Sequence, residues 1–463
     1  MRLRRLGTVA IGLILSALTM PAAVAAHQLS ASFASRLPLA VYLVGAAGAV
    51  ALSFVFVLVR DLRADPVADD GRRVTMPAPV RGPLRVVGLI GWAWIMAQGL
   101  LGGESDAEVS RLFTWVYGWV GIALISALAF PIWTWLDPFS TLHDIGAWIG
   151  RRLGAGGVSP AEYPIALGRW PAVIGFAAVV WLELVAVGAG SRTLALVIAG
   201  YTVYTLAMMA QYGRATWSRN GEIFSVWFSL VGRLAPLAPL APLATLTEDR
   251  AGLLRRRDFA AGLREGGWAT SDIVLAGLAT GSILFDGLSQ TQIWVDAFGL
   301  PGALPQTLLL ATFLGIIVGA ALVVARLVGV SATGAGLVPI AVGYLLAHYF
   351  TYLVIDGQRI VIAISDPLQQ GRDYFGTAFF EPTAAWLPPG LVWTLQLAAV
   401  VGGHMIGAWA GHVVAARTAA GEGPVRGDGL SVRRRQIPLA IVMVALTTLT
   451  LWSLGQALFI PTN

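Results

Sequence analysis

LPQTLLLATFLGIIVGAALVVARL, residues 304–327, is an apolar run that contains one charged side chain, Arg326. A helix rises 1.5 Å per residue, so this run extends about 36 Å, enough to cross roughly 30 Å of hydrocarbon. The run therefore predicts a membrane-spanning helix.

The composition of the whole chain supports the same environment. Of 463 residues, 57% are hydrophobic and 12% are charged, whereas soluble domains carry about 25% charged residues. These values exclude an ordinary soluble protein. Apolar runs of spanning length predict an all-α, polytopic transmembrane helix bundle of about ten spans, at 38–59, 86–103, 112–135, 171–189, 193–211, 272–294, 304–327, 336–356, 390–416 and 437–460.

The N-terminus has the pattern of a secretory signal peptide over residues 1–26. Arginines precede an apolar segment, and small residues end it at Val24, Ala25 and Ala26. Cleavage after Ala26 leaves His27 as the first mature residue, cleavage after Ala25 fits equally well, and an uncleaved anchor is a further alternative. Residues 27–463 are then a single transmembrane domain.

The positive charge of the chain predicts its orientation. All basic residues are arginines, and they lie in short blocks between the spans, which favours a topology signal over nucleic-acid binding. The arginine-rich loops fall on one side, predicted to be cytoplasmic, and the acidic segment 104–108 falls on the other. This predicts a multi-pass protein of the bacterial cytoplasmic membrane with an extracytoplasmic mature N-terminus.

Two segments do not fit regular spans. Residues 224–246 are long enough to cross, but they contain Arg233 and three prolines, which deny backbone donors to a helix. We interpret this segment as interfacial or re-entrant. Residues 357–389 are predicted to form an extracytoplasmic, lid-like loop over the bundle.

Four ionisable residues lie within predicted spans, where such side chains usually face a partner or a cavity. They are Glu183, Asp286, His348 and His404. Their depths place them in one polar layer. The alternative interpretation is that each makes an ordinary interhelical hydrogen bond.

Helical spacing refines this layer. Tyr344, His348 and Tyr352 are four residues apart and share one face, so a tyrosine hydroxyl can orient the imidazole. Small residues at Gly403, Gly407 and Gly411 form a ridge that lets another helix approach His404. The arrangement permits His348 and His404 to meet.

A metal site would draw on histidines and a carboxylate, because cysteine is absent. The α-amine and imidazole of a mature N-terminal His27 can chelate one ion, and nitrogen-rich sites favour copper, with zinc as the alternative. Equally, His27 marks only the edge of the signal. The candidate metal ligands are His27, Asp286, His348 and His404.

Several segments resemble a family of bacterial polytopic membrane proteins that are often labelled fenitrothion hydrolase. They are WVYGWVGIALISAL (115–128), YPIALGRWPAVIGFAAVVWLELV (163–185), GEIFSVWFSLVGRLAPL (221–237), FDGLSQTQIW (285–294), LAHYFTYLVIDGQ (346–358) and SDPLQQGRDYFGTA (365–378). The resemblance implies membrane-bound hydrolysis of organophosphorothioate esters. It also implies that the polar positions Glu183, Asp286, Gln290, His348, Tyr352, Gln358 and Asp366 belong to the family's motifs.

Three functions remain open from the sequence. An outward-facing intramembrane polar site suits the binding or transport of a metal ion, copper above all, or of a small solute. As a hydrolase, Asp286 and His348 would supply metal ligands or a general base, although no HExxH or serine-elbow motif is present. As a membrane assembly subunit, the polar layer would serve helix packing.

Overall fold

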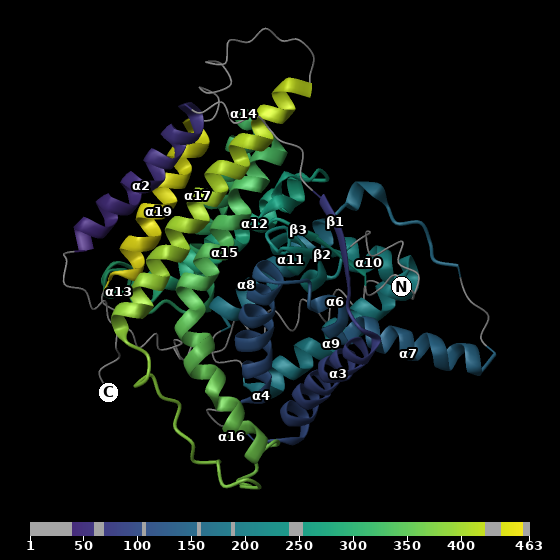
Figure 1. Ribbon diagram of the computed structural model, residues 1–463. Coiled ribbons are helices and arrows are strands. Elements are labelled where there is room, and N and C mark those ends of the chain that lie inside the picture. Colours follow the sequence, from purple (N-terminus) through teal and green to yellow (C-terminus); the bar gives the residue numbers. More distant parts are fainter. Residues whose placement is uncertain are drawn as a thin grey trace.

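The computed structural model describes residues 39–59, 69–103, 108–154, 159–186, 190–239, 253–421 and 437–456. The predicted signal peptide and His27 lie outside these residues. The described chain is an all-α helical bundle with one small antiparallel sheet (Figure 1).

Each of the ten predicted spans contains a long helix. Nine helical segments in the described residues are long and apolar enough to cross a membrane, and α2 is a further apolar helix. In chain order the long elements are α2 (Leu39–Val59), α3 (Ala78–Leu101), the continuous α4 (Val109–Arg111), η1 (Leu112–Ile122) and α5 (Ala123–Leu128), then α8 (Trp170–Leu184), α9 (Ser191–Tyr212), α12 (Thr270–Ser289), α14 (Ala303–Val328), α15 (Val330–Ile355), α17 (Pro389–Gly421) and α19 (Ile437–Leu454).

Some boundaries differ from the predicted ones, for local reasons. The third predicted span ends at Leu128 instead of residue 135, just before Phe130 and Pro131 break the helix. The helix predicted from residue 336 begins at Val330, because Gly329 alone connects α14 to α15. Gly329 has a φ of 99°, a conformation that glycine adopts without strain.

Shorter elements fill the regions between the long helices. They are α6 (Trp133–Leu136), α7 (Pro138–Arg152), η2 (Ile165–Leu167), α10 (Arg214–Asn220), α11 (Ile223–Val231), η5 (Ala261–Arg264), α13 (Gln292–Phe298), η6 (Asp356–Arg359) and α16 (Ile360–Ser365). The strands β1 (Asp69–Thr75), β2 (Leu237–Pro239) and β3 (Leu253–Arg257) pair antiparallel in the order β1-β3-β2.

The two irregular segments have defined structures where they are described. The segment 224–246 contains α11, a nine-residue helix with seven buried side chains, followed by β2, and residues 240–252 lie outside the described part. Beyond α16, residues 366–388 form an extended loop. Its backbone is tied to α3, because Trp94 Nε1 donates to the Pro367 carbonyl at 2.7 Å.

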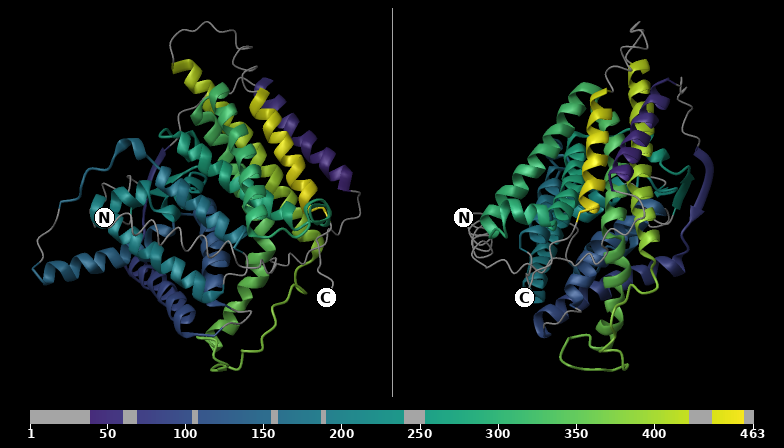
Figure 2. Two further views of the ribbon diagram at one scale, coloured as in Figure 1. Left: turned by 180° about the vertical axis from the view of Figure 1, so that it is seen from behind. Right: turned by 90° about the vertical axis from the view of Figure 1, so that its left-hand side faces the viewer.

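The helices α12 and α15 lie at the centre of the bundle, and most of their residues are buried. Along one flank α2, α19 and α17 run side by side, and α17 packs along α15 (Figures 1 and 2). Glycines make that crossing close: a Cβ on Gly343 would lie 2.5 Å from the Ala399 carbonyl oxygen, and one on Gly407 2.4 Å from that of Gly336. The predicted glycine ridge is therefore confirmed, with α15 as its partner.

Candidate functional site

Three helices bring the candidate residues together. Glu183 is the penultimate residue of α8, Asp286 lies in the last turn of α12, and His348 and Tyr349 are adjacent on α15. The helices α8 and α12 pack against each other and run in the same direction, so their C-terminal ends lie at the same end of the bundle. The central position of α15 buries His348 and Tyr349, whereas Glu183 and Asp286 are partly exposed.

Asp286 and His348 form the closest pair in this site. Asp286 Oδ2 lies 2.8 Å from His348 Nε2, and the exposed fractions of the two side chains are 14% and 4%. The other oxygen, Oδ1, accepts a hydrogen bond from Gln290 Nε2 at 2.7 Å, one helical turn further on. Because an ionised aspartate only accepts hydrogen bonds, this contact assigns the histidine proton to Nε2.

The Tyr349 hydroxyl connects this pair to a second carboxyl group. Its oxygen lies 3.1 Å from Asp286 Oδ2 and 3.2 Å from Glu183 Oε1. The ring of Tyr349 is buried, and it meets the His348 ring edge to face at 4.6 Å between centroids. We call Glu183, Asp286, His348 and Tyr349 the tyrosine-bridged site.

The two hydrogen bonds of the Tyr349 hydroxyl limit the protonation states of the neighbouring carboxyl groups. A tyrosine hydroxyl has one proton to donate, yet it lies within hydrogen-bond distance of two carboxyl groups. Both contacts are satisfied when one carboxyl group is protonated and donates to the tyrosine oxygen. Asp286 Oδ1 accepts from the Gln290 amide, which favours the ionised form of Asp286, so we assign the extra proton to Glu183.

The remaining candidates lie in other contacts. His404 is fully buried, its Nδ1 donates to the Val400 carbonyl at 2.8 Å, and its Nε2 lies 3.4 Å from the Tyr344 hydroxyl. Tyr344, one of the two tyrosines on the His348 face, thus contacts His404. Gln358 anchors the loop after α16, since its amide exchanges hydrogen bonds with the backbone of Thr383.

The structure describes three of the four predicted metal ligands, and it brings only two of them into contact. Of the four candidate ligands, Asp286 and His348 are in contact, His404 pairs with Tyr344, and His27 lies outside the described residues. Across the ranges that the structure describes, no group of three or more His, Cys, Asp or Glu side chains has an arrangement that could hold a metal ion. Copper or zinc binding stays a prediction.

Sequence reasoning missed Tyr349, the residue that joins the two carboxyl groups. It follows His348 directly and therefore lies about 100° away around the helix, off the face shared by Tyr344, His348 and Tyr352. The available signal was a second hydroxyl-bearing aromatic residue beside an intramembrane histidine. Which of the tyrosines near His348 meets the carboxylates depends on how α8 and α12 pack against α15.

Comparisons of the chain with protein-family models, curated proteins and solved structures find no significant match. The resemblance to the family labelled fenitrothion hydrolase therefore stays a hypothesis.

Proposed function

We propose that the protein is a membrane transport protein that binds a proton at the tyrosine-bridged site. The observation that supports this most is the single hydroxyl between Glu183 and Asp286, whose two contacts are both satisfied when one carboxyl group is protonated. Carboxyl and histidine groups in hydrogen-bonded series are the usual components of proton pathways in membrane transporters.

Proton binding at the tyrosine-bridged site also offers a way to couple the charge of the two carboxyl groups to movement of their helices. Glu183 and Asp286 belong to different helices, α8 and α12, and loss of the shared proton leaves a negative charge on each. Like charges in a region of low dielectric repel strongly. At their other ends the same two helices are held by an ion pair of 2.6 Å between Arg169 and Asp272. Deprotonation would therefore separate one pair of helix ends while the other stays fixed.

A second function is favoured by one observation. A carboxylate that holds an imidazole at 2.8 Å is the arrangement of a general base, so the Asp286–His348 pair also suits hydrolysis of an ester. The two functions differ in what they require: transport needs a protein-dependent ion flux, whereas hydrolysis needs turnover of an organophosphorothioate ester without any flux.

Reconstituted vesicles give the test. Purified protein is incorporated into liposomes that contain a pH-sensitive dye, and a potassium diffusion potential drives protons inward. We expect protein-dependent acidification that falls at least tenfold in Asp286→Asn, since the amide removes the negative charge that keeps the shared proton on Glu183. Asp296→Asn is the matched control, because Asp296 also accepts from a glutamine amide one turn away but is exposed.

Two results would contradict the proposal: acidification no faster than in protein-free vesicles, or equal rates for the wild type and Asp286→Asn. Turnover of an organophosphorothioate ester in those vesicles, lost in Asp286→Asn, would favour the hydrolase. Loss of the folded protein in this variant, judged by gel filtration in detergent, would favour a packing role in an assembly subunit.

A further inference from the structure

The helix α7 has an apolar stripe that is exposed in the structure. Ile145, Trp148 and Ile149 are 41%, 54% and 44% exposed. Their spacing of three and four residues places them on one helical face. We call these three residues the α7 stripe. Large apolar side chains that gather on one exposed face indicate a contact surface, whereas single exposed ones are common.

The contacts of Asp144 place the first half of α7 at the membrane boundary. Asp144 Oδ2 pairs with Arg85 at 2.5 Å and with Arg214 at 2.7 Å. Arg85 directly precedes the predicted span 86–103, and Arg214 lies just beyond α9, which ends at Tyr212. Both α3 and α9 are long and apolar enough to cross a membrane. The helix α7 therefore starts where two spanning helices leave the apolar region.

From this boundary α7 runs outward, away from the bundle and across the direction of α15 (Figures 1 and 2). Its first turns pack against α3 and α9. There Thr141 Oγ1 accepts a hydrogen bond from Arg85 Nε at 3.3 Å. Thr141 precedes Ile145 by four residues and Trp148 by seven, so the α7 stripe continues the helical face that contacts α3.

The lipid-facing surface of α3 begins at the same level. Directly after Arg85, α3 exposes Val86, Val87 and Ile90. The α7 stripe thus starts beside apolar side chains that the bilayer covers. An amphipathic helix that leaves a bundle at this depth has the arrangement of a helix that lies in the membrane interface.

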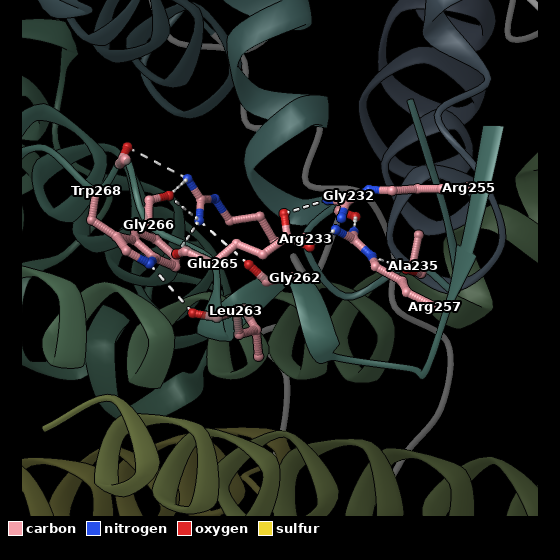
Figure 3. Close-up of polar contacts among 11 residues, drawn as sticks. Gly232, Arg233, Ala235, Arg255, Arg257, Gly262, Leu263, Glu265, Gly266 and Trp268 are labelled. Carbon is pink, nitrogen blue, oxygen red and sulfur yellow. Dashed lines mark hydrogen bonds and ion pairs between the residues drawn. The ribbon is translucent and has the colours of Figure 1, made fainter. Parts of the chain in front are cut away.

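The last turn of α7 adds positive charge beside the α7 stripe. Arg151 and Arg152 are both exposed, and the Arg152 guanidinium group lies 5.3 Å from the centre of the Trp148 ring. In another arginine-rich loop, by contrast, Arg257 is bound within the protein: it pairs with Glu265 and donates to two carbonyl groups (Figure 3). Exposed basic residues at a membrane surface are attracted to anionic lipid headgroups.

We propose that α7 lies in the membrane interface, with the α7 stripe inserted among lipids and with Arg151 and Arg152 at anionic headgroups. Lipid is favoured over a protein partner because the stripe starts at the membrane boundary, beside the lipid-facing surface of α3. The proposal does not depend on proton binding, since it rests on the exposed face of α7 alone.

The test uses the full chain in vesicles of phosphatidylglycerol and phosphatidylcholine. The sequence contains no cysteine, so Ile149→Cys can be labelled with one NBD fluorophore. Ala147→Cys, on the opposite face of α7, is the matched control. A doxyl spin label on the lipid acyl chains quenches fluorophores that enter the membrane. We expect quenching about twofold or more stronger at position 149 than at position 147.

Further variants separate the contributions to this contact. Ile145→Cys is a second labelling site on the α7 stripe, used if Ile149→Cys does not fold. Arg151→Gln combined with Arg152→Gln, or vesicles of phosphatidylcholine alone, should weaken the quenching at position 149, because both remove the attraction between charges. Unchanged quenching in both would contradict the role of the arginines.

Two results would overturn the lipid contact. One is equal quenching at positions 149 and 147. The other is a blue-shifted emission at position 149 without doxyl quenching, which would show that a protein surface, such as a second copy of the chain, covers the α7 stripe.

Discussion

Tyr349 carries the chemistry that distinguishes the tyrosine-bridged site from an ordinary buried ion pair. Glu183, Asp286 and His348 were all predicted from the cost of placing an ionisable side chain in a membrane. This cost shows which residues need partners, but it does not show which side chains those partners are. A hydroxyl causes little penalty of its own, so the sequence does not show which tyrosine of α15 contacts the carboxyl groups.

Removal of this hydroxyl gives a direct test at the residue scale. In Tyr349→Phe, Glu183 and Asp286 lose the group that links them, while the ring keeps its packing against His348. We expect proton flux to fall about tenfold, as loss of one hydrogen bond to a charged group costs about 1.5 kcal/mol. The measurement is dye acidification in vesicles. Tyr374→Phe, in the exposed loop, should behave as the wild type, and an unchanged rate in Tyr349→Phe would contradict this role.

Asp137 provides a pH-dependent test outside the spans. Its Oδ1 caps α7 by accepting from the Phe139 and Ser140 backbone, and burial together with the charge of Glu222 raises its pKa from 3.8 to about 7. A raised carboxyl pKa means that the folded state holds the proton more tightly. The associated stability is therefore present at acidic pH and is lost as pH rises from about 4 to about 7.

Asp137→Asn keeps a capping oxygen and removes the titration. We expect the variant to lack this decline in stability and to exceed the wild type at pH 8 by roughly 1 to 4 kcal/mol. Thermal unfolding in detergent across this pH range measures it. Parallel profiles for the two proteins would show that Asp137 does not titrate in this range.

At the scale of elements, the helices were predictable and the sheet was not. Long apolar runs determine a spanning helix because every backbone group must be satisfied within it. The strands β1 and β3 carry arginines instead of an alternating apolar pattern, and their pairing joins Val74 with Leu254, which are far apart in the sequence. Local sequence contains no signal for such a pairing.

The crossing of α15 and α17 tests the role of the glycine ridge. In Gly403→Ala the new Cβ would lie 2.6 Å from the Pro339 carbonyl oxygen, so the helices must separate. We expect a loss of about 1 to 3 kcal/mol in stability. The neighbouring Gly402→Ala meets no atom within 4 Å and should be neutral or slightly stabilising. Equal melting temperatures for the two variants, by thermal unfolding in detergent, would refute the close crossing.

At the scale of the whole molecule, the arginine-rich loops predict which end of the bundle faces the cytoplasm. The sequence contains no cysteine, so single cysteines report their location without background. Ala384→Cys lies in the exposed loop after α16, and Ala161→Cys lies exposed near the start of α8. A membrane-impermeant maleimide should label Ala384→Cys in intact cells and Ala161→Cys only after permeabilisation. The reverse pattern would invert the topology and place the tyrosine-bridged site nearer the cytoplasm.

The central claim is that one proton resides in the tyrosine-bridged site, on Glu183. Infrared difference spectroscopy of the reconstituted protein detects it most directly, through the carbonyl stretch of a protonated carboxylic acid. The measurement uses an Asp137→Asn background, so that Asp137 does not contribute. We predict a band at neutral pH that disappears in Glu183→Gln and persists in Asp296→Asn. An identical band with and without Glu183→Gln, or no band at all, would contradict the account.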